Sequence, residues 1–194
     1  MKKLFLLLIL LSVPVLLFSA PFGFSMGMSL DDLTQACDGV EPEHMEDDCY
    51  YVFPVKKHPL FKHYVAFVDD YKGLYCIKAV SDEISTNDYG TEIQNAFSEI
   101  KERISKTYGR PRMIDEIAED SLWKDDKYWI YSLADGARTY AAVWKSSAKN
   151  ELKDDLTAVS IYASAKKYPQ TGWIILEYDF NNMQAVQDAQ DDVF

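Results

Sequence analysis

The sequence predicts an α+β fold, an antiparallel sheet with helices packed on one face. Residues 91–108 carry apolar side chains at helical spacing, which predicts a long amphipathic helix. Segments rich in aromatic and β-branched residues precede and follow it, separated by short stretches of turn-forming residues. Because a helix-like segment is followed by strand-like segments twice, the single domain 21–194 also divides into two candidate α/β halves, 21–84 and 85–194.

The N-terminus has the pattern of a secretory signal peptide. Two lysines precede an apolar run over residues 4–18, and Ser19 and Ala20 supply small residues at its end. The run falls short of the ~20 apolar residues that span a bilayer. We therefore expect a signal peptide at 1–20 and an extracytoplasmic protein, periplasmic or secreted. A retained membrane anchor is the alternative, because the bulky Phe18 fits the cleavage pattern poorly.

The charge balance limits the classes of partner. Asp and Glu number 31 against 20 Lys and Arg, a formal net charge of −11. A chain this acidic repels phosphate backbones and anionic membrane surfaces, so we expect no nucleic-acid partner and no stable membrane contact after cleavage of the signal peptide.

The first half of the mature chain reads as a strand, a helix and further strands. Apolar and small residues alternate over 22–28, which predicts a strand, and Ser29 then caps a helix that has Asp31 and Asp32 in its first turn. An acidic loop follows, then the short strand "YYVFPV". The segment 63–80 is typical of a β-hairpin that turns over residues 69–73.

The second half opens with the predicted helix 91–108. Thr91 and Gln94 have the spacing of a capping box, and Gly109 is placed to end the helix. Four strand candidates follow, "KYWIYSL", "RTYAAVW", "LTAVSIYASA" and "GWIILEYDF". The tail from residue 181 has only loose helical spacing.

Three cysteines remain after export. In an oxidising compartment we expect two to pair, and Cys37 with Cys49 would close a short acidic loop. The spacing leaves other pairings open. The odd thiol, Cys76 in that pairing, is interpreted as a buried apolar filler rather than a reactive group.

Catalytic and metal motifs are weak. No G-x-S-x-G occurs, and S-x-x-K occurs three times without its usual partner motifs. The acidic segment 41–48, with His44 and the nearby Cys49, is a candidate cation site, but a solvated loop is the favoured interpretation and no spaced ligand motif supports a metal. We expect no cofactor, no metal and no catalytic residue that the sequence can specify.

Aromatic residues are the stronger indication of function. Six of them lie on the predicted strands of the second half: Trp129, Tyr131, Tyr140, Trp144, Tyr162 and Trp173. If one sheet face is uncovered, the outward members form a surface of the kind enriched in protein interfaces. The leading hypothesis is therefore an exported, non-enzymatic protein- or peptide-binding module of the cell envelope. The alternative is an extracytoplasmic hydrolase with an unrecognised carboxylate site.

Two short motifs carry a family resemblance. "GMSLDDL" and "ISKTYGRP" resemble small exported proteins of the SmpA/BamE type, the matching residues being Gly27, Met28 and Ser29, then Gly109, Arg110 and Pro111. The resemblance implies helices set against a short antiparallel sheet. The layout is also similar to beta-lactamase-inhibitor-like proteins, which repeat such a unit in tandem. The wider run "TNDYGTEIQNAF" resembles an uncharacterised family of exported bacterial proteins.

Overall fold

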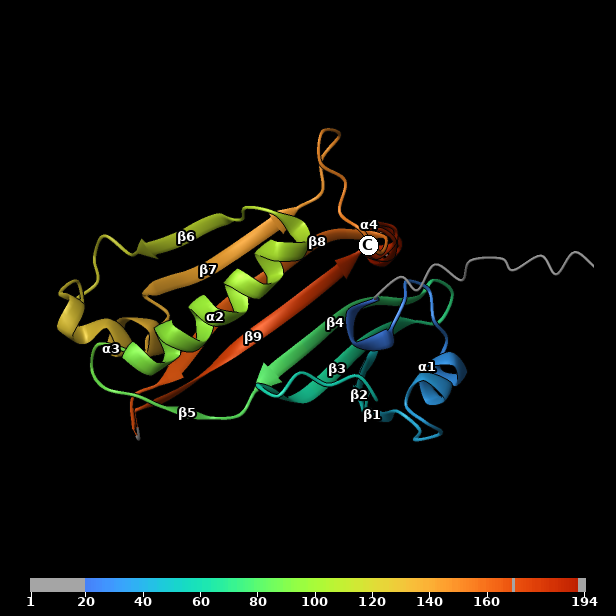
Figure 1. Ribbon diagram of the computed structural model, residues 1–194, viewed down its shortest axis with the longest axis horizontal. Helices are drawn as coiled ribbons and strands as arrows, with labels where there is room; N and C mark the ends of the chain where they lie inside the picture. The colour runs from blue at the N-terminus through green and yellow to red at the C-terminus, as the bar shows by residue number, and fades with distance from the viewer. Residues whose placement is uncertain (1–19, 169, 192–194) are drawn as a thin grey trace, which may run out of the picture.

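The computed structural model describes residues 20–168 and 170–191, so the predicted signal peptide lies outside the described residues except for Ala20. The described residues form an antiparallel sheet of nine strands with helices packed against it (Figure 1). This confirms the predicted α+β class. The strands are β1 (Glu43–Glu46), β2 (Cys49–Val52), β3 (Phe61–Asp69), β4 (Gly73–Ser81), β5 (Ile84–Ser85), β6 (Arg112–Ile117), β7 (Arg138–Lys145), β8 (Leu156–Lys166) and β9 (Thr171–Phe180).

Two meanders meet at the centre of this sheet. The strand order is β1-β2-β3-β4-β9-β8-β7-β6, and the short β5 pairs with the start of β9. Helix α1 (Leu30–Ala36) precedes the first meander and helix α2 (Thr91–Tyr108) precedes the second. The described parts of 21–84 and 85–194 thus share a succession of a helix and antiparallel strands, joined where β4 pairs with β9.

Helix α2 crosses one face of the sheet, over β8 and β9 (Figure 1). Its buried residues are Ile93, Phe97, Ile100 and Ile104, which are part of the apolar stripe that the sequence indicated. The helix ends as predicted at Gly109, whose amide donates to Ser105 O at 2.9 Å. Its start differs from the predicted capping box, because the N-cap is Gly90 and the Gln94 side chain donates to Tyr89 O instead.

The predicted cap of α1 is confirmed. Ser29 Oγ accepts from the Asp32 amide at 3.2 Å, and the Asp32 carboxylate accepts from the Ser29 amide at 2.9 Å. These reciprocal bonds satisfy amides that a helix start would otherwise leave without partners. Leu33 and Cys37 then enter the main hydrophobic core from this helix.

The predicted strand over 22–28 is wrong. Residues Pro21–Gly23 form a single 3-10 turn, η1, and Phe22 has a left-handed φ of 55° that no strand contains. The backbone meets the sheet only at 27–28, where the Gly27 amide donates to Leu74 O and the Leu74 amide donates to Met28 O. Alternation of apolar and small residues was therefore a poor guide in a segment this rich in glycine.

The predicted strand "KYWIYSL" is also wrong. It forms the short 3-10 helix η2 (Asp126–Tyr128) followed by helix α3 (Trp129–Ala134). The buried residues Trp129, Ile130 and Leu133 have helical spacing, i, i+1 and i+4, and the Asp125 side chain caps η2 by accepting from the Lys127 amide. The aromatic composition favoured a strand, whereas the helical spacing of the buried residues and the cap at Asp125 are those of a helix.

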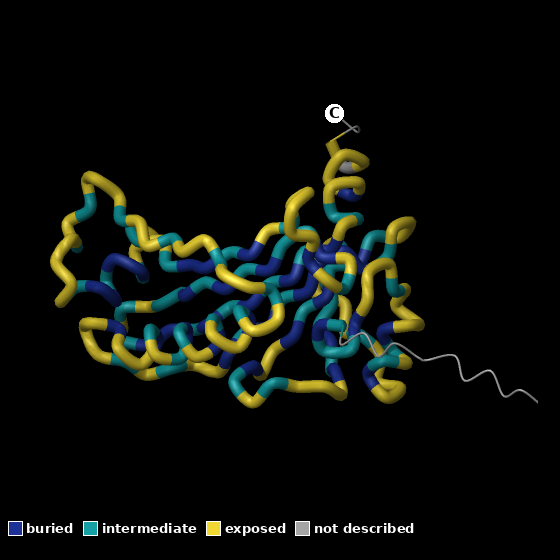
Figure 2. The backbone as a smooth tube through the Cα atoms, turned by 45° about the horizontal axis from the view of Figure 1, so that its top comes forward, coloured by how far each residue is buried: buried dark blue, intermediate teal, exposed yellow. Residues whose placement is uncertain are grey.

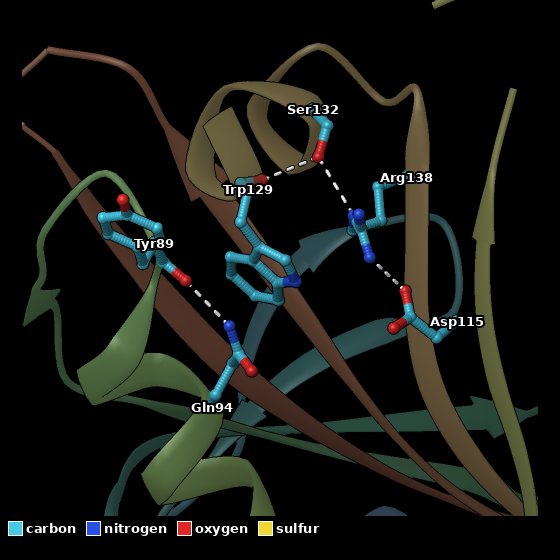
Figure 3. A network of polar contacts seen from close by, with 6 residues as sticks. All are labelled: Tyr89, Gln94, Asp115, Trp129, Ser132 and Arg138. Carbon is cyan, nitrogen blue, oxygen red and sulfur yellow. Dashed lines mark hydrogen bonds and ion pairs between the residues drawn. The ribbon is translucent and has the colours of Figure 1, made fainter. Parts of the chain in front are cut away.

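Helix α3 is tied to the sheet by one buried arginine (Figure 3). The Arg138 side chain on β7 is only 9% exposed; its Nε donates to Ser132 Oγ at 3.1 Å and its guanidinium pairs with Asp115 on β6. Ser132 Oγ in turn donates to Trp129 O at 2.7 Å. The chain of bonds orients α3 over β7 and β8.

Helix α4 (Met183–Asp191) lies on the opposite side of the sheet from α2 (Figure 2). Val186 is buried there beside Tyr75 and Cys76, with Phe67 and Met183 packed around them. Away from this contact, the second sheet face carries half-buried side chains at alternate positions of β8 and β9. The helix-bearing face is thus the one that α2 and α3 cover, while the second face is covered by a helix only near α4 among the described residues.

Candidate functional site

A large cavity lies on the helix-bearing face, between η1 and the C-terminal half of α2. Its volume is about 700 Å³, within the range of small-ligand sites. The residues that line it come from both halves of the chain: Ala20, Pro21, Phe22, His58, Phe61, Ile100, Arg103, Ile104, Thr107, Tyr108, Lys153, Asp154, Leu176 and Tyr178. We call this space the η1–α2 cavity.

The floor of the η1–α2 cavity is apolar and aromatic. Leu176 and Tyr178 project from β9, and the Phe22 ring packs edge-on against Tyr178 and Phe61, with centroid distances of 5.8 and 6.3 Å. Edge-to-face pairs at these distances stabilise a fixed arrangement of rings. The floor is therefore preformed rather than dependent on a ligand for its order.

Two residues that line the cavity have unusual backbone conformations. Phe22 has φ 55° and Asp154 has φ 61°, both in the left-handed region. Aspartate adopts this region readily, but for a bulky aromatic residue it is an outlier. Strain of this kind persists where the surrounding structure holds it, and it concentrates at binding sites. Phe22 is held by its three ring contacts, with Phe61, Tyr64 and Tyr178.

Ionisable groups form the rim of the η1–α2 cavity. Two cations, Arg103 and Lys153, lie there with one acid, Asp154, and with His58, which is neutral. This local excess of basic groups contrasts with the net charge of −11 on the whole chain. Arg103 is held by Glu99 one turn earlier, at 2.9 Å, and remains exposed. The rim therefore favours an anionic group in a ligand.

The histidine of the rim is poised as a neutral donor. Burial and then the charge of Arg103 lower the pKa of His58. Its Nδ1 accepts from the Leu60 amide at 3.2 Å, which assigns the proton of the neutral ring to Nε2. Nearby, burial and the Asp154 carboxylate raise the pKa of Tyr108 to about 12, so its hydroxyl stays protonated at neutral pH.

The lining has the composition of a ligand site. Apolar side chains form most of it, and a few polar groups lie at its rim, as is usual for sites that bind small ligands or single side chains. Sequence reasoning missed this site, because its lining comes from five separated segments, none of which carries a ligand-binding motif.

The six aromatic residues expected to bind a partner are divided by the structure. Trp129 and Trp144 are 4% and 2% exposed in the core, and the ring of Tyr140 packs on Trp129, so these three are not outward-facing. Tyr131, which is on α3, stacks with Trp123 from the segment that precedes this helix. Tyr162 and Trp173 alone lie on the second sheet face, where they alternate with core residues of β8 and β9.

The cysteines do not form the expected disulfide. Cys37, Cys49 and Cys76 are free thiols in the structure, and Cys37 is buried in the main core while Cys49 begins β2, between the edge strand β1 and β3. Cys37 follows α1, so its position was fixed by the packing of that helix rather than by proximity in sequence. Cys76 is buried, as interpreted from the sequence.

The acidic segment 41–48 forms β1 and its turn rather than a loop. The His44 ring interacts with Asp47 O at 2.9 Å and packs edge-on against Tyr50. The described residues contain one group of converging metal donors, and it lies elsewhere. Among the described residues, the donor atoms of segment 41–48 therefore do not converge into a cation site.

That converging group is at the centre of the second sheet face. It consists of Cys76 on β4 with Glu177 and Asp179 on β9, and one donor atom from each lies within 4.8 Å of the others. Lys78 pairs with Glu177 at 3.2 Å. Burial and the neighbouring Glu177 raise the pKa of Asp179 to about 6.

A hydrolase with a carboxylate site, the alternative function, requires two converging acids within a concave pocket. Glu177 and Asp179 are two converging acids. The η1–α2 cavity lies on the opposite face of β9 and contains neither of them, since Leu176 and Tyr178 are the residues of that strand that line it. The acids and the η1–α2 cavity are thus separated by the sheet, which weakens the hydrolase alternative.

No family model, curated protein or solved structure matches this chain. Among the described residues, no helix is both long and apolar enough to cross a bilayer.

Proposed function

We propose that this chain is an exported, non-enzymatic binding module of the cell envelope and that its binding site is the η1–α2 cavity. The observation that carries the proposal is a preformed apolar floor beneath a basic rim. The cavity is large enough for one large side chain and part of the backbone of a peptide. The proposed binding site is thus on the helix-bearing face rather than on the aromatic strands that the sequence favoured.

The chemistry of the cavity selects the ligand class. An aromatic or branched aliphatic side chain would bury its area against Phe22, Leu176 and Tyr178, and burial is worth about 25 cal/mol per Å² of apolar surface. A carboxylate next to it would meet Arg103 and Lys153 at the rim. The proposed ligand is therefore a peptide segment with a large apolar side chain beside an acidic group.

The proposal is tested by filling the cavity from its exposed wall. Thr107 lies on the exposed side of α2 and lines the cavity, whereas its neighbour Lys106 is exposed and does not line it. We expect Thr107→Trp to weaken binding of short peptides that carry Phe or Leu beside Asp or Glu by about tenfold or more, a loss of about 1.4 kcal/mol. Lys106→Trp is the matched control and should leave affinity unchanged.

The affinities are measured by calorimetric titration of the mature protein. The titrated peptides are these acidic ones and matched versions that carry Asn or Gln in place of the acid. Tighter binding of the acidic peptides than of the Asn or Gln versions would support a role of the rim in binding the carboxylate. This difference in affinity should disappear in Arg103→Gln. Equal binding by the Thr107→Trp and Lys106→Trp variants, or no binding of any member of the set by the wild-type protein, would overturn the proposal.

A further inference from the structure

The thiol and two carboxylates on the second sheet face have the arrangement of a metal donor set. Cys76 and Asp179 are direct partners in the β4–β9 pair, and Glu177 is two residues before Asp179 on the same face. Directly opposed side chains in an antiparallel pair have Cβ atoms about 5 Å apart. Their donor atoms converge to within 4.8 Å of one another, a separation that the two central strands of the sheet fix.

The site also contains a polar atom that lacks a partner. Asp179 Oδ1 is buried and makes no hydrogen bond in the structure. Burying a carboxylate oxygen without a hydrogen-bond partner costs folding free energy. Binding of an ion to that oxygen is one of the recognised explanations for such an atom. Because the same carboxylate belongs to the converging group, the unsatisfied atom and the donor set point to a ligand at one place.

We propose that Cys76, Glu177 and Asp179 bind a divalent cation of the zinc type. One thiolate and two carboxylates are ligands that zinc accepts, and three protein ligands leave the fourth tetrahedral position open to water. Binding forms a metal–sulfur bond and releases the thiol proton of Cys76 to solvent. Harder cations such as calcium and magnesium take oxygen ligands and have no use for the thiol.

The charges around the site balance with such an ion. A thiolate and two carboxylates carry three negative charges, which a divalent cation and the Lys78 ammonium together neutralise. Lys78 approaches from the Glu177 side, at 3.2 Å, and leaves Asp179 Oδ1 without a partner. Glu177 retains 18% exposure of its side chain, so the site borders solvent and an ion can enter from that side.

The test isolates Cys76 before a metal is added. Cys37→Ser and Cys49→Ser together leave Cys76 as the single thiol and remove the cysteine beside the acidic segment 41–48. Cobalt(II) titration of this double variant is followed by absorption. We expect one equivalent to bind, with a thiolate-to-cobalt charge-transfer band and the visible bands of a tetrahedral site, and zinc to displace it.

Substitutions within the site then assign the ligands. Cys76→Ser in the same background should abolish the charge-transfer band, and Asp179→Asn should weaken binding by about tenfold or more, as removal of site groups commonly does. Asp115→Asn, which removes a carboxylate on β6, is the matched control and should leave the titration unchanged.

Absence of the charge-transfer band in the double variant would overturn the proposal, and so would cobalt binding that survives Cys76→Ser with the same affinity. Circular dichroism establishes that each variant is folded. If Cys76→Ser does not fold, the Asp179→Asn titration decides, because an unchanged affinity there contradicts the site on its own. The η1–α2 cavity is on the other face, so peptide binding is a separate measurement that this result does not affect.

Discussion

Gly90 lies directly against the indole ring of Trp129. A Cβ atom at Gly90 would come within 2.0 Å of the ring, and the backbone there is left-handed, with φ 67°. The glycine is the N-cap of α2 and the tryptophan is the first residue of α3, so this contact sets the separation of the two helices. The adjoining Asp88 carbonyl accepts from the Ile130 amide at 3.1 Å and reinforces the same junction.

Gly90→Ala is expected to destabilise the protein through this contact. The left-handed conformation costs a non-glycine residue about 1–2 kcal/mol, and overpacking adds about 1–3 kcal/mol. Gly136→Ala is the matched control, because Gly136 has φ 70° but no atom within 4 Å of its Cβ position. Urea unfolding of both variants measures the difference. Equal losses would show that the indole contact carries no energy of its own.

The buried arginine gives a second prediction. Arg138→Met removes the guanidinium that pairs with Asp115 and donates to Ser132 (Figure 3). We expect a loss of about 1–3 kcal/mol in the free energy of unfolding, because hydrogen bonds to a charged group are broken while Asp115, half exposed, regains water.

A double-mutant cycle separates the ion pair from the packing. Asp115→Asn alone should cost less than Arg138→Met, since Arg138 keeps its bond to Ser132. A coupling energy of about 1 kcal/mol is expected for residues in direct contact. Strictly additive losses would mean that the pair contributes nothing beyond the individual side chains.

The histidine of the cavity rim predicts a pH dependence. Burial and Arg103 lower the pKa of His58 in the folded protein relative to its ordinary 6.5. The folded state therefore binds fewer protons than the unfolded state below this pH. The stability that the neutral ring contributes is present above pH 6.5 and is lost as the pH falls through the lowered value.

Thermal or urea unfolding between pH 7.5 and about 5 measures this effect, with the neutral His58→Gln variant as the comparison. The wild-type protein should lose stability on acidification faster than His58→Gln. His63→Gln is the control, because His63 lies on β3, outside the cavity, and bonds to the Tyr51 hydroxyl instead. Parallel pH profiles for wild type and His58→Gln would contradict the assignment.

Much of the architecture was predictable because it depends on local chemistry. The stripe of α2, the reciprocal cap of Ser29 and Asp32, and the hairpin of β3 and β4 all follow from spacing within a few residues. Strands were wrongly predicted at 22–28 and 127–133, where composition suggested them, and the strands β1 and β6 were not predicted. Glycine-rich backbone in the first and helical burial of Trp129 in the second overrode that preference.

By itself, the sequence determined the fold class, the main helix and its end, most of the strands, and the acidic character of the chain. Only the tertiary structure decided which aromatic residues are buried, because a strand's period of two says that two faces exist but not which one the helices cover. It also brought Phe22 to Tyr178 and Cys76 to Asp179. Both sites join segments about a hundred or more residues apart, which become neighbours only when β4 pairs with β9.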